Sequence, residues 1–163
     1  MSALECPSHD DFSDLIPQDM NSVDGKFKSN NDTEFPQEAS VIVCYNPLLD
    51  LILAVHRKDD TSDYGLPGGK VEFNENPINA ALRELSEETR YYANDSDLVF
   101  LDTRIDENYI VYVYTLDFEK LMFHNQKYEN CDGWKTLKDL SSGSFGEFNK
   151  LLFEDLLLGV NLH

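Results

Sequence analysis

Short runs of β-branched and aromatic residues mark the predicted strands of this chain. They cover Ala39–Tyr45, Leu51–His56, Leu98–Leu101 and Tyr109–Leu116. The run at Leu98–Leu101 is the weakest of these, and the run at Tyr109–Leu116 is the most regular. Asn46 and Pro47 lie between the first two runs, so a turn is expected to join them.

Two further segments have the apolar spacing of an amphipathic helix. In the first, the residues at positions i, i+3, i+4 and i+7 form one stripe: Ile78, Ala81, Leu82 and Leu85. Asn76 supplies an N-cap and Pro77 suits the first turn. A second helix is expected around Phe148–Leu156, ending at Gly159. Strands before, between and after helices predict an α/β fold, a mixed sandwich in which helices cover a sheet.

Residues 1–38 differ in composition from the rest of the chain. They are rich in Asp, Asn and Ser, contain only Lys26 and Lys28 as basic residues, and show no sustained apolar period. We interpret them as a flexible, solvated acidic N-terminal arm, and a flap over a substrate site or a dimer contact is the alternative. One folded domain is expected over residues 39–163.

The formal net charge of -18 restricts the possible partners. It argues against nonspecific binding to duplex nucleic acid or to an anionic membrane, because phosphate binding depends on positive charge. A phosphorylated substrate would therefore need cations. No apolar run approaches the roughly 18 residues of a membrane span, and Met1–Leu15 lacks signal-peptide features, so a cytoplasmic protein is expected. Cys6, Cys44 and Cys131 are too widely spaced for a zinc site and are expected to be free thiols.

Three carboxylates recur at helical spacing in the first predicted helix. Glu84, Glu87 and Glu88 are related by three and four positions, so they project from one face. Taken alone, E-x-x-E-E is most often an ordinary solvated acidic face. Like charges at this spacing repel each other, however, and a divalent cation would remove that conflict. Carboxylate oxygens are the hard ligands that Mg²⁺ prefers, and Mn²⁺ is an alternative.

The surrounding spacing resembles the Nudix box, G-x5-E-x7-R-E-U-x-E-E-x-G-U, in which U is a bulky aliphatic residue. The positions that match are Gly69, Glu75, Arg83, Glu84, Leu85, Glu87 and Glu88. The preceding run, Gly65–Glu72, is also similar to the usual lead-in of the family. The resemblance covers about Ala39–Leu140 and implies the Nudix α/β/α sandwich, with a mixed β-sheet between helices.

The resemblance also implies a metal site. Glu87 and Glu88 would be the first Mg²⁺ ligands, and Glu84 a further ligand or a group that orients water. The carbonyl oxygen of Gly68 would complete the set.

Supporting roles follow from the same resemblance. Arg83 would hold a neighbouring carboxylate in place, and Glu75 would support the loop. Glu129 lies a few residues before Trp134, where many members carry a loop glutamate that acts as a ligand or base. A merely solvated Glu129 is the alternative, and core packing is the favoured interpretation of Trp134.

The chain departs from the box where the helix should end. Arg90 stands in place of the second Gly, and Tyr91 in place of the aliphatic residue that follows. A left-handed turn strains a residue that has a Cβ atom, so we expect a changed exit, with Asn94 and Asp95 stopping the helix a few residues later.

The function that the resemblance implies is Mg²⁺-dependent hydrolysis of a pyrophosphate bond in a nucleoside diphosphate derivative, releasing a nucleoside monophosphate. Candidate substrates are nucleoside triphosphates, ADP-ribose or nucleotide sugars, and dinucleoside polyphosphates. Tyr109 is a hint for the last class, whereas Gly68–Lys70 is more similar to the first two. A catalytically weak module that binds or senses nucleotides is the alternative, and a purely structural domain is a third possibility. Many relatives form homodimers, and the same is possible here.

Overall fold

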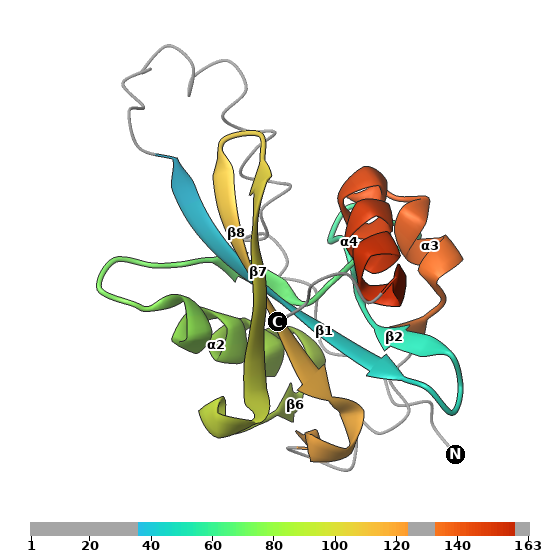
Figure 1. Cartoon of the computed structure of the whole chain (residues 1–163), viewed down its shortest axis with the longest axis horizontal. Coiled ribbons are helices and arrows are strands. Elements are labelled where there is room, and N and C mark those ends of the chain that lie inside the picture. Colours follow the sequence, from blue (N-terminus) through green and yellow to red (C-terminus); the bar gives the residue numbers. More distant parts are fainter. Residues whose placement is uncertain (1–35, 124–132, 159–163) are drawn as a thin grey trace.

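A mixed six-stranded sheet forms the centre of the protein, in a computed structural model that describes residues 36–123 and 133–158 (Figure 1). In sheet order the strands are β10 (Trp134–Lys135), β2 (Leu51–Leu53), β1 (Gln37–Asn46), β8 (Tyr109–Asp117) and β7 (Leu98–Asp106), and β5 (Gly68–Lys70) also pairs with β1. β1 and β8 are parallel, whereas the other neighbours are antiparallel. Two short two-stranded sheets pair β3 (Val55–His56) with β4 (Tyr64–Gly65), and β6 (Tyr91–Tyr92) with β9 (Met122–Phe123).

Helices cover both faces of the main sheet (Figure 1). The helix α2 (Pro77–Thr89) lies on one face, while α3 (Leu137–Ser141) and α4 (Gly146–Leu158) lie on the other. Alternate side chains of β1 point to opposite faces of the sheet and pack against the helices on each face. Ile42 packs in the cluster that contains Leu85 of α2, and Val43 packs in the cluster that contains Leu152 of α4. Short 3₁₀ helices occur at Asp95–Asp97 (η2) and Phe118–Lys120 (η3). The predicted α/β/α sandwich is confirmed.

The first helix begins where its capping residues predict. The Asn76 side chain accepts a hydrogen bond of 2.9 Å from the Asn79 amide, and Pro77 is the first helical residue. Ala81 and Leu85 are fully buried, with Ile78 and Leu82 partly buried beside them. The second predicted helix is confirmed as α4, whereas Gly159, its expected end, lies outside the described residues.

The prediction of one strand at Leu51–His56 is wrong. The chain leaves the main sheet at Ala54, whose amide donates a hydrogen bond of 2.6 Å to the Gly133 carbonyl. β2 therefore belongs to the main sheet, and β3 belongs to a separate pair with β4. Both halves are apolar, so periodicity could not reveal the break.

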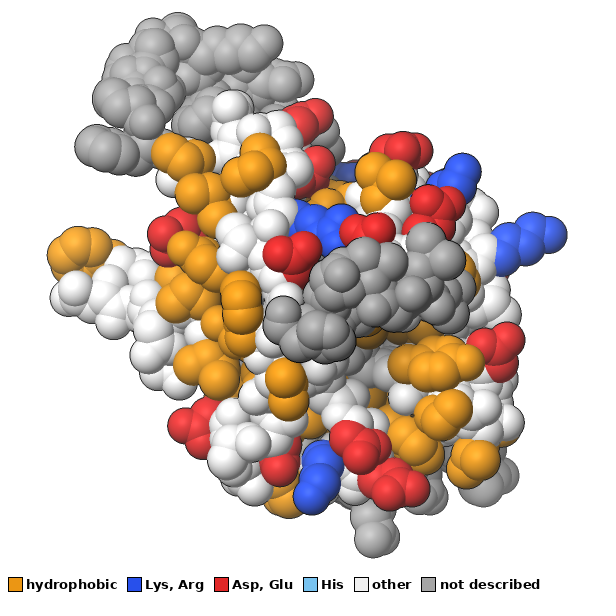
Figure 2. Space-filling view, in the orientation of Figure 1, with side chains coloured by type: hydrophobic (Ala, Val, Ile, Leu, Met, Phe, Trp, Pro, Cys, Tyr) orange, Lys and Arg blue, Asp and Glu red, His pale blue; other side chains and the backbone are white. Residues whose placement is uncertain are grey.

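The predicted strand at Leu98–Leu101 is longer than expected. β7 continues to Asp106, with a bulge between Phe100 and Asp102. It lies at the outer edge of the main sheet, where charged side chains are tolerated. Arg104 of this strand binds Asp155 of α4 at 2.6 Å. Val99, Phe100 and Ile105 of this strand are exposed. Figure 2 shows a band of hydrophobic side chains on the face where β7 runs in Figure 1.

Cys44 is a buried thiol on the α2 side of the sheet. Burial raises its pKa to about 12, and the nearby Asp117 carboxylate acts in the same direction. The thiol therefore stays protonated at neutral pH, as a packing residue. Cys6 and Cys131 lie outside the described residues.

None of the helices in the described part of the chain is long and apolar enough to cross a bilayer.

Candidate active site

The short strand β5 presents two different backbone edges. The Pro67 carbonyl accepts a hydrogen bond of 3.0 Å from a β1 amide, and the Val71 amide donates one of 2.9 Å to a β1 carbonyl. In an antiparallel ladder, residues that alternate with such bonded positions direct their N–H and C=O groups away from the partner strand. Gly68 and Lys70 occupy these alternate positions, so their backbone groups point away from β1.

The outward edge of β5 faces α2. The Gly68 amide donates a hydrogen bond of 3.0 Å to Oε1 of Glu88, and the Lys70 carbonyl accepts one of 3.0 Å from Nη2 of Arg83. Because N–H and C=O of one strand residue point to the same side, the Gly68 carbonyl is also directed toward the helix that carries the carboxylates.

Glycine at positions 68 and 69 allows β5 to approach its two neighbours closely, β1 and α2. A Cβ atom on Gly68 would lie 2.2 Å from the Ser40 carbonyl oxygen, and one on Gly69 would lie 2.3 Å from Oε1 of Glu84. Neither space can hold a side chain without movement of the backbone or of Glu84. Gly68 therefore lets β5 pack closely on β1, and Gly69 lets α2 pack directly on β5.

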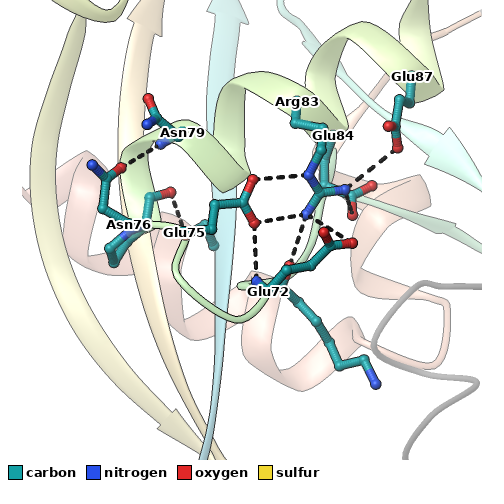
Figure 3. A network of polar contacts seen from close by, with 10 residues as sticks. Glu72, Glu75, Asn76, Asn79, Arg83, Glu84 and Glu87 are labelled. Atoms are coloured by element: carbon teal, nitrogen blue, oxygen red, sulfur yellow. Dashed lines mark hydrogen bonds and ion pairs between the residues drawn. The ribbon is translucent and has the colours of Figure 1, made fainter.

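Arg83 is the centre of a polar network, shown in Figure 3. Its Nε and Nη2 atoms donate to the two carboxylate oxygens of Glu75 at 2.9 and 3.1 Å. Its Nη1 atom donates to Glu84 at 2.9 Å and to Glu87 at 3.4 Å. Glu75 also accepts a hydrogen bond of 2.9 Å from the Glu72 amide, which ties the loop to the helix. The Glu75 hydrogen bonds raise the pKa of Arg83, which therefore stays charged.

The three box carboxylates differ in exposure. Glu84 is 2% exposed and Glu88 is 7% exposed, whereas the side chain of Glu87 is 47% exposed. The single acidic face that the spacing predicts thus contains two buried groups and one that solvent reaches. Because each buried carboxylate has a donor, from Arg83 or from Gly68, the cost of burying its charge is reduced.

The donor types at this place fit a hard divalent cation. Glu84, Glu87 and Glu88 supply carboxylate oxygens from successive turns of α2, and the Gly68 carbonyl is directed toward the same helix. Their side chains do not yet surround one point, since no group of three or more acidic, His or Cys side chains within residues 36–123 and 133–158 is gathered closely enough to hold an ion. Glu87 and Glu84 instead share the Nη1 atom of Arg83.

The expectation of a changed helix exit at Arg90 is wrong. The helix ends at Thr89, and Arg90 adopts the left-handed conformation, with φ 69° and ψ 4°. The Thr89 hydroxyl explains how the turn is held, because it donates to the Leu85 carbonyl at 2.6 Å and accepts from the Tyr91 amide at 3.0 Å. Asn94, expected near the helix stop, instead precedes η2.

The aromatic residue that follows the turn is also held in place. The Tyr91 ring contacts Phe123 edge-on at 5.1 Å, and the Tyr91 hydroxyl accepts a hydrogen bond of 3.3 Å from Nε1 of Trp134. Trp134 is partly buried and packs against the core on the α2 side. These contacts connect the end of α2 to the sheet.

Substitution of Arg90 by glycine is expected to stabilise the protein by about 0.5–1 kcal/mol. Glycine relieves the left-handed strain of about 1–2 kcal/mol, and its greater freedom in the unfolded chain offsets part of this gain. Urea unfolding measures the change. Asn74→Gly is the matched control, because Asn74 has a similar φ of 63° but tolerates it better, so its gain should be smaller. Equal or negative effects of both substitutions would contradict this account.

The stabilising contribution of Glu75 should depend on pH. Hydrogen bonds from Arg83 lower the pKa of Glu75 below its ordinary value of 4.5. A carboxyl group with a lowered folded-state pKa contributes stability above its unfolded pKa and loses it as the pH falls through the folded one. Glu75→Gln should therefore destabilise at pH 7, and the difference from the parent should shrink below about pH 4.5. Urea unfolding from pH 8 to pH 3 measures this, and a constant difference would oppose it.

A cavity lies on the α4 face of the sheet, next to β5. Gly68 lines it, together with Val41 and Val111 of the sheet and Phe145 and Phe148 near the start of α4.

Three charged residues at this cavity, Arg57, Asp63 and Asp106, were not expected from the sequence. They come from separate segments, and no motif connects them. Glu129, the other predicted catalytic residue, lies outside the described residues.

A family model for the NUDIX domain matches residues 35–156. Comparison with curated proteins gave no match.

Solved structures share the fold. A NUDIX hydrolase from Nitrosomonas europaea is 17% identical, with a TM-score of 0.58 over 76% of this chain and 90% of that one. A MutT protein from Bacillus halodurans is 16% identical, with a TM-score of 0.53 over 74% and 82%. An ADP compounds hydrolase is 19% identical, with a TM-score of 0.51 over 78% and 76%. At these identities the likeness concerns the fold alone.

Proposed function

The chain belongs to the Nudix family and is a hydrolase of pyrophosphate bonds in nucleotide derivatives, and on this premise we propose that it is Mg²⁺-dependent and releases a nucleoside monophosphate. The observation that carries the proposal is the carboxylate arrangement at β5. Glu88 is buried against the Gly68 amide, and Arg83 holds Glu84 and Glu87 on the same side of α2. Two buried carboxylates on one helix are costly, and a bound cation offers a reason to keep them.

The residues that would hold Mg²⁺ are Glu84, Glu87 and Glu88, with the Gly68 carbonyl as a further ligand. When bound, the ion supplies positive charge that stabilises the charge developing on a transferring phosphoryl group. This also accounts for how a chain of net charge -18 accepts an anionic substrate.

The chain's own residues position this set. Arg83 fixes the rotamers of Glu84 and Glu87 and at the same time binds the loop through Glu75. Glu88 is fixed by the Gly68 amide. Glu87 is the exposed member, so it is a candidate to accept a proton from the attacking water, and Glu129 is the other. The pH–rate profiles of Glu87→Gln and Glu129→Gln separate these assignments. Only loss of the general base should abolish the fall in rate at low pH that protonation of the base causes.

The cavity beside Gly68 is where we place the nucleoside. It has apolar and aromatic walls, and it lies on the opposite face of the sheet from the carboxylate helix, reached across the edge strand β5. A base in the cavity and a diphosphate over β5 would bring the scissile bond toward Glu84 and Glu88. Two other hollows fit less well. One is lined largely by polar residues beside Glu84, and the other shares no residue with the box.

A substrate panel tests the proposal. Purified protein with Mg²⁺ is incubated with ADP-ribose, NADH, dinucleoside polyphosphates and normal or oxidised deoxynucleoside triphosphates in ¹⁸O-labelled water. Phosphorus NMR and mass spectrometry then identify the products and the phosphorus atom attacked. Turnover of at least one member, lost without the metal, supports the proposal. A ligand that binds with Mg²⁺ and is recovered uncut would support a binding module instead, and inactivity on the whole panel would oppose hydrolysis.

A further inference from the structure

Asp106 brings a carboxyl group to the wall of the nucleoside cavity. It is the last residue of β7 and pairs with Tyr109 of β8, so the two side chains lie on the same face of the sheet. Tyr109 and Val111 belong to the cluster that packs against α4, which places Asp106 on the cavity side. The carboxyl group lines the cavity and is half-buried.

The other charged or polar side chains of the cavity, those of Arg57, Asp63 and Asn149, are already engaged. Asp63 accepts a hydrogen bond of 2.9 Å from the Ser144 amide and lies 3.9 Å from Nη1 of Arg57. Arg57 also contacts Asp59 at 3.3 Å and the Ser144 hydroxyl at 3.3 Å. The Asn149 side chain donates to the Leu140 carbonyl at 3.1 Å. These three residues therefore hold the loops around the cavity together.

Asp106 differs from them. Its carboxylate makes no hydrogen bond or ion pair with the part of the chain that the structure describes, residues 36–123 and 133–158. Burial raises the pKa of the group, and the neighbouring Glu107 charge adds to this. A half-buried carboxylate without donors gains more from a ligand N–H group than a solvated one does.

We propose that Asp106 determines base specificity by accepting hydrogen bonds from a nucleobase that presents adjacent ring and exocyclic N–H donors, as guanine does. This inference rests on the proposed function, because it places the nucleoside in the same cavity.

The chemistry of the carboxylate selects this class of base. Its two oxygens are acceptors in one plane, and guanine offers two neighbouring donors, the ring N1–H and the exocyclic amino group. Adenine presents an acceptor beside its amino group, which would face one of the carboxylate oxygens. Hypoxanthine keeps the ring N–H but lacks the amino group. The apolar walls bind all three bases alike, so the difference between them falls on Asp106.

Equilibrium binding of nucleoside monophosphates in the absence of Mg²⁺ tests the inference. Isothermal titration of the full chain should show GMP binding about 10- to 100-fold more tightly than IMP, as expected for one hydrogen bond to a charged acceptor. Asp106→Asn replaces one acceptor oxygen by an amino group and should reduce this preference to less than about 3-fold, mainly by weakening GMP binding. Glu107→Gln is the matched control, since it removes the same charge one residue away, and it should keep the preference.

Each outcome decides one question. Equal affinities for GMP and IMP in the parent, or an unchanged preference in Asp106→Asn at unchanged melting temperature, overturns the role of Asp106. Loss of the preference in Glu107→Gln as well as in Asp106→Asn overturns it too, because long-range charge would then explain the effect. Turnover of the substrate panel without a preference among bases supports the proposed hydrolysis and overturns the role of Asp106. A base preference without turnover supports the role of Asp106 and contradicts the proposed hydrolysis.

Discussion

Replacement of Glu88 by glutamine is expected to lower kcat/KM by about 100-fold or more while the protein stays folded. A ligating carboxylate contributes more than the residues behind it, whose loss alone typically costs about 10- to 100-fold. The glutamine carbonyl can still accept the hydrogen bond from the Gly68 amide, so the contact between α2 and β5 is retained. Initial rates on the best substrate of the panel, together with Mn²⁺ binding followed by EPR, measure the two effects.

Glu154→Gln is the matched control for this experiment. Glu154 lies exposed on α4, on the opposite face of the sheet, and the substitution removes the same charge. Its rate and Mn²⁺ affinity should equal those of the parent. If Glu88→Gln behaved like Glu154→Gln, the assignment of Glu88 to the metal would have to be given up.

Substitution of Arg83 by lysine is expected to destabilise the protein by about 2 kcal/mol. The guanidinium serves Glu75, Glu84, Glu87 and the Lys70 carbonyl from three nitrogens, and one ammonium group cannot reach them all. Buried Glu84 would lose its hydrogen-bond donor at 2.9 Å. The two hydrogen bonds to Glu75 would be reduced to one. The midpoint of urea unfolding should fall while the m-value stays constant.

Arg104→Lys controls for the chemistry of the substitution. The Arg104 side chain is 20% exposed, close to the 25% of Arg83, and it also contacts two carboxylates, Asp102 and Asp155. Both of those partners are half-exposed, so the expected loss is below about 1 kcal/mol. Equal losses in the two variants would mean that the network around Arg83 has no special stabilising role.

The helix α2 is the part of the fold that local sequence predicts best. Its start depends on the Asn76 cap and on Pro77, and its buried side depends on a 3.6-residue period, all of which are local features. The contact between Arg83 and Glu75 connects residues eight positions apart and also lies within the motif. The spacing of these residues in the sequence is therefore enough to predict that the groups lie together.

Features that depend on distant segments could not be predicted in this way. β5 is only three residues long and is defined by its pairing with β1, while β7 is an edge strand whose charged residues hide its period. The short helix α3 was not predicted, although the capping box of Thr136 and Asp139 is a local signal for its start.

The error at Arg90 has a different origin. The sequence indicates the strain of a left-handed arginine, but the compensating hydrogen bonds of the adjacent Thr89 hydroxyl are visible only in the structure. Asp106 reaches the cavity only through the register of β7 with β8, which sequence spacing does not reveal.

The guanidinium of Arg83 gives the acidic helix an internal counter-charge that is covalently part of the chain. Repulsion among the glutamates is thereby relieved before any ion arrives, so folding need not wait for metal, unlike in small domains that are built around zinc. Chelation should then switch the protein off without unfolding it. With the proposed metal site, activity would rise and fall with the free Mg²⁺ concentration, because the ion binds reversibly to a protein that is already folded.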